Sequence, residues 1–148
     1  MESGGKSNFI MQNSLDRFIQ AQENDYQTAL AEVRAGYKSS HWMWYIFPQM
    51  RGLGRSENAT YYGIKDLEEA KEYLNHPVLG ARLREITTAF LQLSGVSAKE
   101  VLGHTDAMKM LSCMTLFNVV TPKDIFQQVI EKYYNGRDDR LTLSLLKI

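Results

Sequence analysis

Apolar residues recur at helical spacing along most of the chain. Tyr26, Ala29, Leu30 and Val33 occupy the i, i+3, i+4 and i+7 positions that share one face of a helix. Gly36 follows this pattern and is a typical helix end. We expect further helices with the same kind of apolar stripe in residues 15–22, 66–74, 79–91, 105–117, 121–133 and 138–148.

Polar residues that begin helices precede several of these segments. Asp66 with Glu69, and Ser97 with Glu100, have the three-residue spacing of a capping box, in which each residue satisfies a backbone N–H near the other. Thr105 is a candidate N-cap for the helix that follows it. These local signals support the helical boundaries.

Strand patterns are weak. Residues 43–47 and 60–64 are the only candidates, and neither has a partner joined to it by a hairpin turn. The sequence therefore predicts an all-α fold, a compact single-domain bundle of six to eight short helices with at most a minor β element. We place this domain at residues 14–148, after a flexible leader at residues 1–13.

Composition narrows the function classes. The chain has 148 residues, which suits one domain, and its 17 Lys and Arg balance 17 Asp and Glu, so no net charge favours bulk nucleic acid. It has no run of roughly 20 apolar residues that would span a bilayer. The single cysteine, Cys113, excludes an internal disulfide, and its apolar neighbours predict a buried, inert thiol. We expect a cytoplasmic protein that binds neither membrane nor bulk nucleic acid, with an oligomer left open.

Residues 39–56 form the least ordinary segment. It holds both tryptophans, His41, and a Gly-x-Gly-Arg run that ends at Arg55. A core segment needs apolar residues at a regular period, and this mixture of aromatic, basic and hydroxyl groups is more typical of a recognition or reaction surface. We refer to residues 39–56 as the aromatic segment.

The aromatic segment also carries a family resemblance. Its run Ser-His-Trp-Met-Trp-Tyr-Ile-Phe-Pro-Gln and the following Gly-Leu-Gly resemble a bacterial family catalogued as domain of unknown function 1810 (DUF1810). This resemblance implies a mostly helical single-domain fold and no established activity. It continues through motifs at residues 62–64, 69–70, 73–74, 76–83, 106–109, 112–117, 138 and 142–143.

Two details qualify that resemblance. Members are sometimes labelled calpastatin-like, but inhibitors of that type are disordered, repeat-built chains, whereas this chain has no repeat and enough apolar periodicity for its own core. In addition, Cys113 stands where the family pattern leads us to expect a serine. Chemistry that requires a hydroxyl at that position is therefore disfavoured.

His41 is the candidate catalytic residue. Its ordinary pKa of about 6.5 allows it to act as a general acid or base near neutral pH. The alternative is a histidine at the start of a helix that packs among aromatic side chains. A nucleophilic pair with Ser40 is less favoured, because adjacent residues rarely meet in productive geometry.

Ligand-binding candidates surround His41. One tryptophan of the pair can stack on a flat ligand, the other serving the core, and the glycine run can hold an anion on its backbone N–H groups. The alternatives are core packing for the tryptophans and a plain turn for the glycines. The candidates in this segment and just before it are Lys38, Ser40, Trp42, Trp44, Gln49, Gly52, Gly54 and Arg55.

A second segment must complete any pocket, since one short stretch cannot enclose a ligand. Asp106, Lys109 and Ser112 interrupt an apolar helix without an obvious capping role, although the first two can simply pair across one helical turn. We predict that His41 or Trp44 lies near at least one of these three residues, around a cleft that also reaches Arg55.

Three functional hypotheses follow from this placement. In the first, the chain binds a small anionic or nucleotide-like ligand through the aromatic segment, with catalysis by His41 as a subordinate possibility. In the second, the aromatic segment docks a partner protein or a second copy, without catalysis. In the third, it only locks helices together. No spacing of His, Asp or Glu indicates a metal site, and we expect no cofactor.

Overall fold

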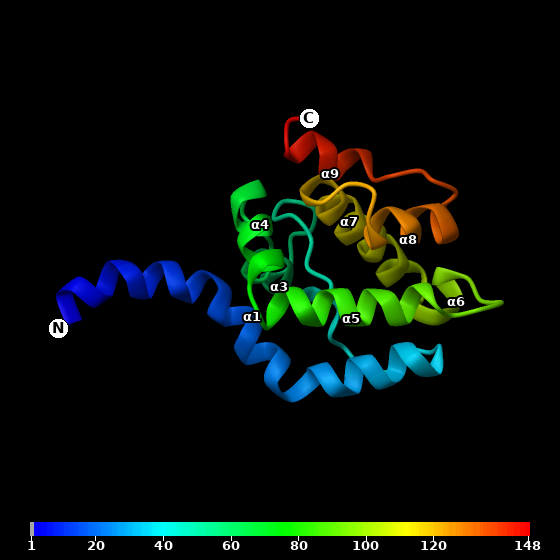
Figure 1. Ribbon diagram of the computed structural model, residues 1–148, viewed down its shortest axis with the longest axis horizontal. Coiled ribbons are helices and arrows are strands. Elements are labelled where there is room, and N and C mark those ends of the chain that lie inside the picture. The colour runs from blue at the N-terminus through cyan, green and yellow to red at the C-terminus, as the bar shows by residue number, and fades with distance from the viewer. Residues whose placement is uncertain (1) are drawn as a thin grey trace.

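The computed structural model describes the backbone of residues 2–148 and the side chains from residue 15 onward. In this part of the chain the expected all-α class is confirmed, with nine helices in place of six to eight because short helical turns add to the count (Figure 1). The only strand-like pairing described is one parallel bridge between Met50 and Ile64. The helices are α1 (Glu2–Ala35), α2 (Met43–Ile46), α3 (Glu57–Tyr61), α4 (Leu67–Asn75), α5 (Leu79–Leu91), α6 (Ala98–Leu102), α7 (His104–Val120), α8 (Ile125–Tyr134) and α9 (Arg140–Leu145).

Helix α1 is longer than the sequence pattern predicts. It runs without interruption through residues 23–25, where two separate helices were expected, because no glycine or proline breaks the chain between residues 15 and 35. Gly36 ends it with a φ of 79°, as expected. The flexibility expected of residues 1–13 stays a prediction, since their side chains lie outside the described part.

Helix α7 forms the centre of the molecule. It packs against α4, α6, α8 and α9 (Figure 1). In its second half the six consecutive residues 112–117 are all buried, so that this half is covered on every face. Phe117 illustrates this position, because its ring centroid lies 5.6 Å from that of Tyr73 on α4 and 5.7 Å from that of Phe126 on α8. A helix surrounded in this way needs apolar residues all round, which explains its blurred sequence periodicity.

Helix caps follow the local signals in part. Ser97 and Glu100 form the expected capping box at α6. At α4 the Asp66 carboxylate accepts the Glu69 N–H as expected, but the Glu69 carboxylate accepts the Lys65 N–H in place of the Asp66 N–H, so the reciprocal half of that capping box is absent. Thr105 does not cap α7. That helix begins one residue earlier, behind Gly103, whose φ of 85° no other residue type adopts readily, and no side chain caps it.

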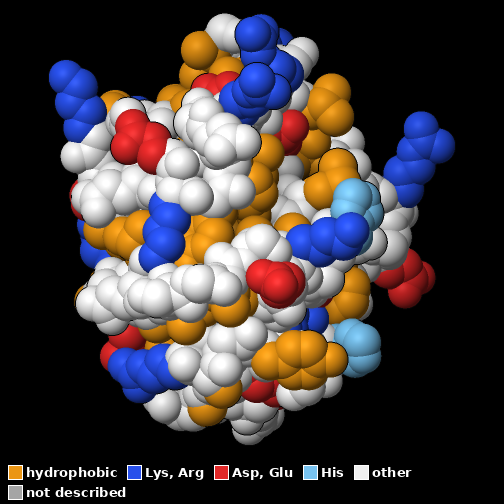
Figure 2. Space-filling view, turned by 90° about the vertical axis from the view of Figure 1, so that its right-hand side faces the viewer, with side chains coloured by type: hydrophobic (Ala, Val, Ile, Leu, Met, Phe, Trp, Pro, Cys, Tyr) orange, Lys and Arg blue, Asp and Glu red, His pale blue; other side chains and the backbone are white. Residues whose placement is uncertain are grey.

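The surface carries mixed charge. Figure 2 shows Lys and Arg side chains spread over the pictured face, with acidic side chains between them and apolar ones in the hollows. On this face no single-sign field is present that would attract a polyanion. Of the helices described, none has the length and apolar character needed to cross a bilayer.

Candidate functional site

The aromatic segment begins on a carboxylate supplied by α1. Glu32 Oε1 accepts the backbone N–H of Ser39 at 2.8 Å, that of Ser40 at 3.0 Å and the indole N–H of Trp42 at 2.9 Å. Its Oε2 accepts the Ser40 hydroxyl. Burial raises the pKa of Glu32, but these hydrogen bonds outweigh burial and lower it to about 2. A charged Glu32 therefore fixes the path of the chain into α2.

Three of the expected ligand contacts belong to this scaffold. Trp42 is buried, and Ser40 is bound to Glu32. The Lys38 ammonium is also nearly buried, donating to the Ser40 carbonyl at 2.6 Å and pairing with the Asp106 carboxylate at 2.8 Å. The polar groups of Lys38, Ser40 and Trp42 are thus used within the protein, and the expected contact of these residues with a ligand stays a prediction.

The two predicted segments do meet. The Lys109 ammonium lies over the Trp44 ring, 4.8 Å from its centroid, and 3.7 Å from Asp106 Oδ1. The other Asp106 oxygen holds Lys38. The expected proximity of Trp44 to Lys109 is therefore confirmed, and the cluster of two ammonium groups and one carboxylate carries one net positive charge.

A cleft of about 410 Å³ opens beside this contact. We call it the α7 cleft, since one face of α7 supplies most of its wall. Gln49, Gly54, Lys109 and Ser112 are the expected site residues that line it. The complete lining is Gln49, Leu53, Gly54, His104, Thr105, Ala107, Met108, Lys109, Leu111, Ser112, Tyr134, Asp139 and Leu141.

The other eight candidates lie outside that lining. His41, Gly52 and Arg55 are exposed residues that do not line the α7 cleft. The Gly52 backbone has a φ of 107°, which makes it a turn residue. The expectation that the cleft reaches Arg55 is therefore wrong, and it ends at the neighbouring Gly54.

Asp139 is an acidic cleft residue that sequence reasoning missed. Its Oδ2 accepts the hydroxyls of Ser112 at 2.7 Å and Thr142 at 2.6 Å, and its backbone N–H donates to the Thr115 hydroxyl at 2.9 Å. Asp139 is also the N-cap of α9, where its Oδ1 accepts the Leu141 N–H at 3.4 Å. An aspartate before a helix is explained by capping alone, so nothing in the sequence pointed to the contact with α7.

The rim of the α7 cleft is apolar. Met108 is 61% exposed and Leu141 is 67% exposed, although both are large hydrophobic side chains. His104, treated from the sequence as a loop residue, begins α7 and lines the cleft. These residues were missed because their role depends on α9 and the turn at residues 49–54 closing over α7.

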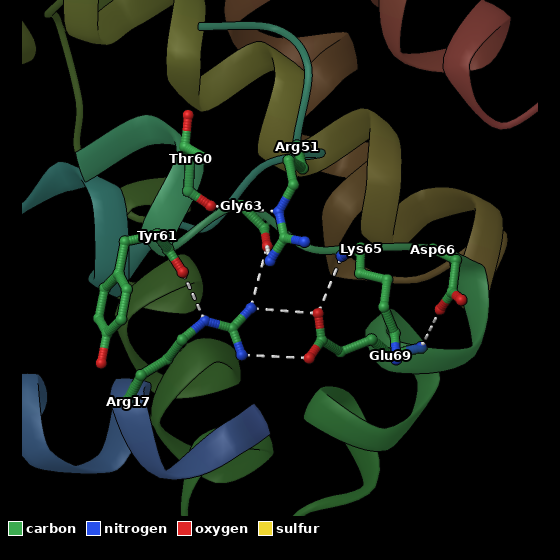
Figure 3. Close-up of polar contacts among 8 residues, drawn as sticks. All are labelled: Arg17, Arg51, Thr60, Tyr61, Gly63, Lys65, Asp66 and Glu69. Carbon is green, nitrogen blue, oxygen red and sulfur yellow. Dashed lines mark hydrogen bonds and ion pairs between the residues drawn. The ribbon is translucent and has the colours of Figure 1, made fainter. Parts of the chain in front are cut away.

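A second polar network, around Arg17, serves the scaffold (Figure 3). The guanidinium of Arg17 pairs with both oxygens of Glu69 at 3.1 Å and donates to the carbonyls of Tyr61 at 2.7 Å and Gly63 at 2.9 Å. The Lys65 N–H donates to the same carboxylate at 2.8 Å. The network therefore fastens α1 to the end of α3, to the loop that follows it and to α4.

The remaining groups of chemical interest are the thiol of Cys113 and the side chains that could bind a metal ion. Cys113 is fully buried, as expected, and burial raises the pKa of its thiol. Among the described residues, no three His, Cys, Asp or Glu side chains gather in a way that could hold a metal ion.

Comparison with known proteins gives a family and a solved relative. A family model described as a protein of unknown function (DUF1810) matches residues 12–146. The chain is similar to the crystal structure of the conserved hypothetical protein Rv1873 from Mycobacterium tuberculosis, at 47% sequence identity and a TM-score of 0.88, over 90% of this chain and 96% of that one. No curated protein shows a significant match. Neither description names a substrate or an activity.

Proposed function

The chain belongs to the DUF1810 family, whose description assigns no activity, and we propose a function from the surface of the protein itself. We propose that the chain binds a small nucleotide-like anion in the α7 cleft. The observation that carries this proposal is the composition of the cleft. Its volume of about 410 Å³ and its mainly apolar wall with a few polar groups match the usual character of small-molecule sites.

Lys109 supplies the charge for an anion. Among the described residues, its ammonium has one carboxylate contact, at 3.7 Å, and that carboxylate is already held by Lys38 at 2.8 Å. The indole face of Trp44 positions the ammonium without neutralising it. Lys109 therefore keeps hydrogen-bond donors and charge for a ligand.

The start of α7 adds to this preference. His104 and Thr105, in its first turn, line the cleft, and no side chain caps the helix there. First-turn N–H groups of a helix lack intrahelical partners and carry partial positive charge, which favours an anion. Leu53, Met108 and Leu141 give the flat part of a ligand an apolar surface.

The other two hypotheses have less support. Docking through the aromatic segment requires an exposed apolar patch, whereas Trp42, Met43, Ile46 and Phe47 are buried. A purely structural segment explains those four residues but not the cleft beside Trp44. Catalysis by His41 loses its geometric basis, because that residue does not line the cleft.

The test is a thermal-shift measurement with AMP, GMP, CMP and UMP. Each is compared with the corresponding uncharged nucleoside. A ligand at one hundred times its Kd stabilises a protein by about 2.7 kcal/mol. We expect at least one monophosphate to raise the Tm more than its nucleoside does. In Lys109→Met, which keeps the apolar stem over Trp44 and removes the charge, that difference should disappear.

Lys99→Met is the matched control. Lys99 is an exposed lysine on the short helix that precedes α7, and it does not line the cleft. This variant should keep the full response to the monophosphate. The proposal fails if no monophosphate shifts the Tm of the wild-type protein, or if Lys109→Met responds as the wild type does.

A further inference from the structure

We propose that the α7 cleft reads a hydroxyl group on its ligand through Ser112, which Asp139 holds in position, so that the ligand class is a phosphate ester with an intact sugar. This inference rests on the proposed function, because it describes the opposite end of the same ligand. Lys109 supplies the charge for the phosphate, Ser112 recognises the hydroxyl group, and Asp139 positions Ser112.

Ser112 is placed to accept a hydrogen bond. Its side chain is 8% exposed, and that small exposure faces the cleft. A hydroxyl has one proton, and the Asp139 carboxylate at 2.7 Å is a better acceptor for it than the Met108 carbonyl at 3.3 Å. With its proton directed to Asp139, Ser112 presents oxygen lone pairs to the cleft, which a ligand O–H can satisfy.

Asp139 fixes the direction of that hydroxyl. It is bound to α7 by its N–H on the Thr115 hydroxyl and to α9 by the Thr142 hydroxyl, so the carboxylate cannot turn away. No Lys or Arg lies within salt-bridge distance of it among the described residues. An uncompensated carboxylate polarises Ser112 and strengthens the hydrogen bond that the serine accepts.

The spacing of the two polar contacts fits one small ligand. Lys109 and Ser112 are three residues apart on α7, so they share a face and lie about 4.5 Å apart along the helix axis. In a nucleoside monophosphate, a phosphate and ribose hydroxyls are likewise separated by a few bonds. A free nucleobase would use only the apolar wall, and inorganic phosphate would use only the end at Lys109.

The experiment compares affinities for AMP and for 2′,3′-dideoxy-AMP by isothermal titration calorimetry. The hydrogen bond that the ligand hydroxyl donates to Ser112 contributes enough for roughly a tenfold preference. We expect the wild-type protein to prefer AMP by about that factor. In Ser112→Ala the preference should fall below about twofold, and in Asp139→Asn it should also fall, because the serine proton loses its anionic acceptor.

Thr142→Val is the matched control. Thr142 donates to the same carboxylate oxygen as Ser112, but it is fully buried and does not line the cleft. This variant should lower the Tm and keep the preference for AMP. A purely structural role for Ser112 would instead make the Ser112 and Thr142 variants behave alike.

The outcomes separate the two proposals. If the wild-type protein binds none of the four nucleoside monophosphates, both proposals are overturned. If it binds a monophosphate other than AMP, the same comparison is made between that nucleotide and its 2′,3′-dideoxy form. If it binds AMP and 2′,3′-dideoxy-AMP equally, or if Ser112→Ala weakens both by the same factor, ligand binding stands and hydroxyl recognition is wrong.

Discussion

The carboxylate of Glu32 holds a stretch of backbone that lies several residues beyond its own turn of helix. Glu32 stands on α1, yet it binds two backbone N–H groups, a hydroxyl and an indole N–H in residues 39–42. These contacts turn the chain from the end of α1 into the buried start of the aromatic segment. A neutral side chain in the same place would accept weaker hydrogen bonds.

The charge on Glu32 makes its contribution depend on pH. Its pKa falls from the ordinary value of 4.5 to about 2 in the folded protein, so its stabilisation is complete above pH 4.5 and is lost as the pH falls towards 2. Glu32→Gln should lower the free energy of unfolding by about 1–2 kcal/mol at pH 7, since the site is partly solvated. Urea denaturation should show this deficit narrowing between pH 4.5 and 2.

Glu23→Gln provides the comparison for Glu32. Glu23 is an exposed residue of the same helix. Its substitution should leave the free energy of unfolding within about 0.5 kcal/mol of the wild type at each pH. A Glu32→Gln deficit that stays constant down to pH 2 would show that the charge is not the source of the stabilisation.

At the scale of elements, α4 and α5 meet at unusually short range. A Cβ built on Gly80 would lie 1.9 Å from the Leu74 carbonyl oxygen and 2.8 Å from its carbonyl carbon. Both atoms belong to the backbone of α4, which cannot move aside without leaving the core. The junction therefore requires glycine for space, although helices ordinarily disfavour it.

Gly80→Ala tests this junction, because the two effects of the substitution change the free energy of unfolding in opposite directions. Helix propensity alone predicts a gain of about 1 kcal/mol, whereas the steric conflict predicts a loss of at least about 2 kcal/mol in the free energy of unfolding. We expect the loss, measured by urea denaturation. Ala81→Gly, at the next and exposed position, should cost about 1 kcal/mol through propensity. A stabilised Gly80→Ala would mean that the two helices separate easily.

Element boundaries show which parts of this fold are encoded locally. The capping box of Ser97 and Glu100 involves residues three apart, so the sequence pattern was sufficient to predict it. The start of α7 was misplaced at Thr105, because it depends on the backbone of Gly103, and any of several polar residues would have matched a cap pattern. Short-range hydrogen bonds and the glycine stop at Gly36 were predictable, whereas the exact residue at which α7 begins was not.

At the scale of the whole molecule, the pair of Arg17 and Glu69 joins residues that are 52 apart in the sequence. Their side chains are 8% and 3% exposed, and each oxygen of the carboxylate accepts from the guanidinium. Removing one partner from a buried pair leaves an uncompensated charge, which typically costs 3–5 kcal/mol. The pair thus binds α1 to the rest of the core.

Arg17→Met should therefore destabilise the protein by about 3–5 kcal/mol. Adding Glu69→Gln to it should recover part of that loss, because the second substitution removes the orphaned charge. Denaturant unfolding of the two single variants and the double variant gives the coupling between them. Additive losses would show that the two side chains act independently, contrary to the geometry.

The candidate site was predictable only in part, for a reason of distance along the chain. Residues 39–56 stood out by composition, and the need for a second wall led to Lys109 and Ser112. Asp139 was missed because its partner Ser112 is 27 residues away and no local pattern links them. His41 and Arg55 were selected for their chemistry, but the direction of their side chains depends on how α2 and the following turn pack.

The central position of α7 limits how the protein can evolve. The same helix carries Met110, Cys113 and Phe117 in the core and Lys109 and Ser112 in the cleft, on adjoining turns. Variation within α7 that alters ligand choice therefore also disturbs packing. New specificities are more accessible through the opposite wall, where Leu53 and Gly54 approach the ligand space from a turn and Leu141 approaches it from the start of α9. Directed evolution of this scaffold should begin with those three positions.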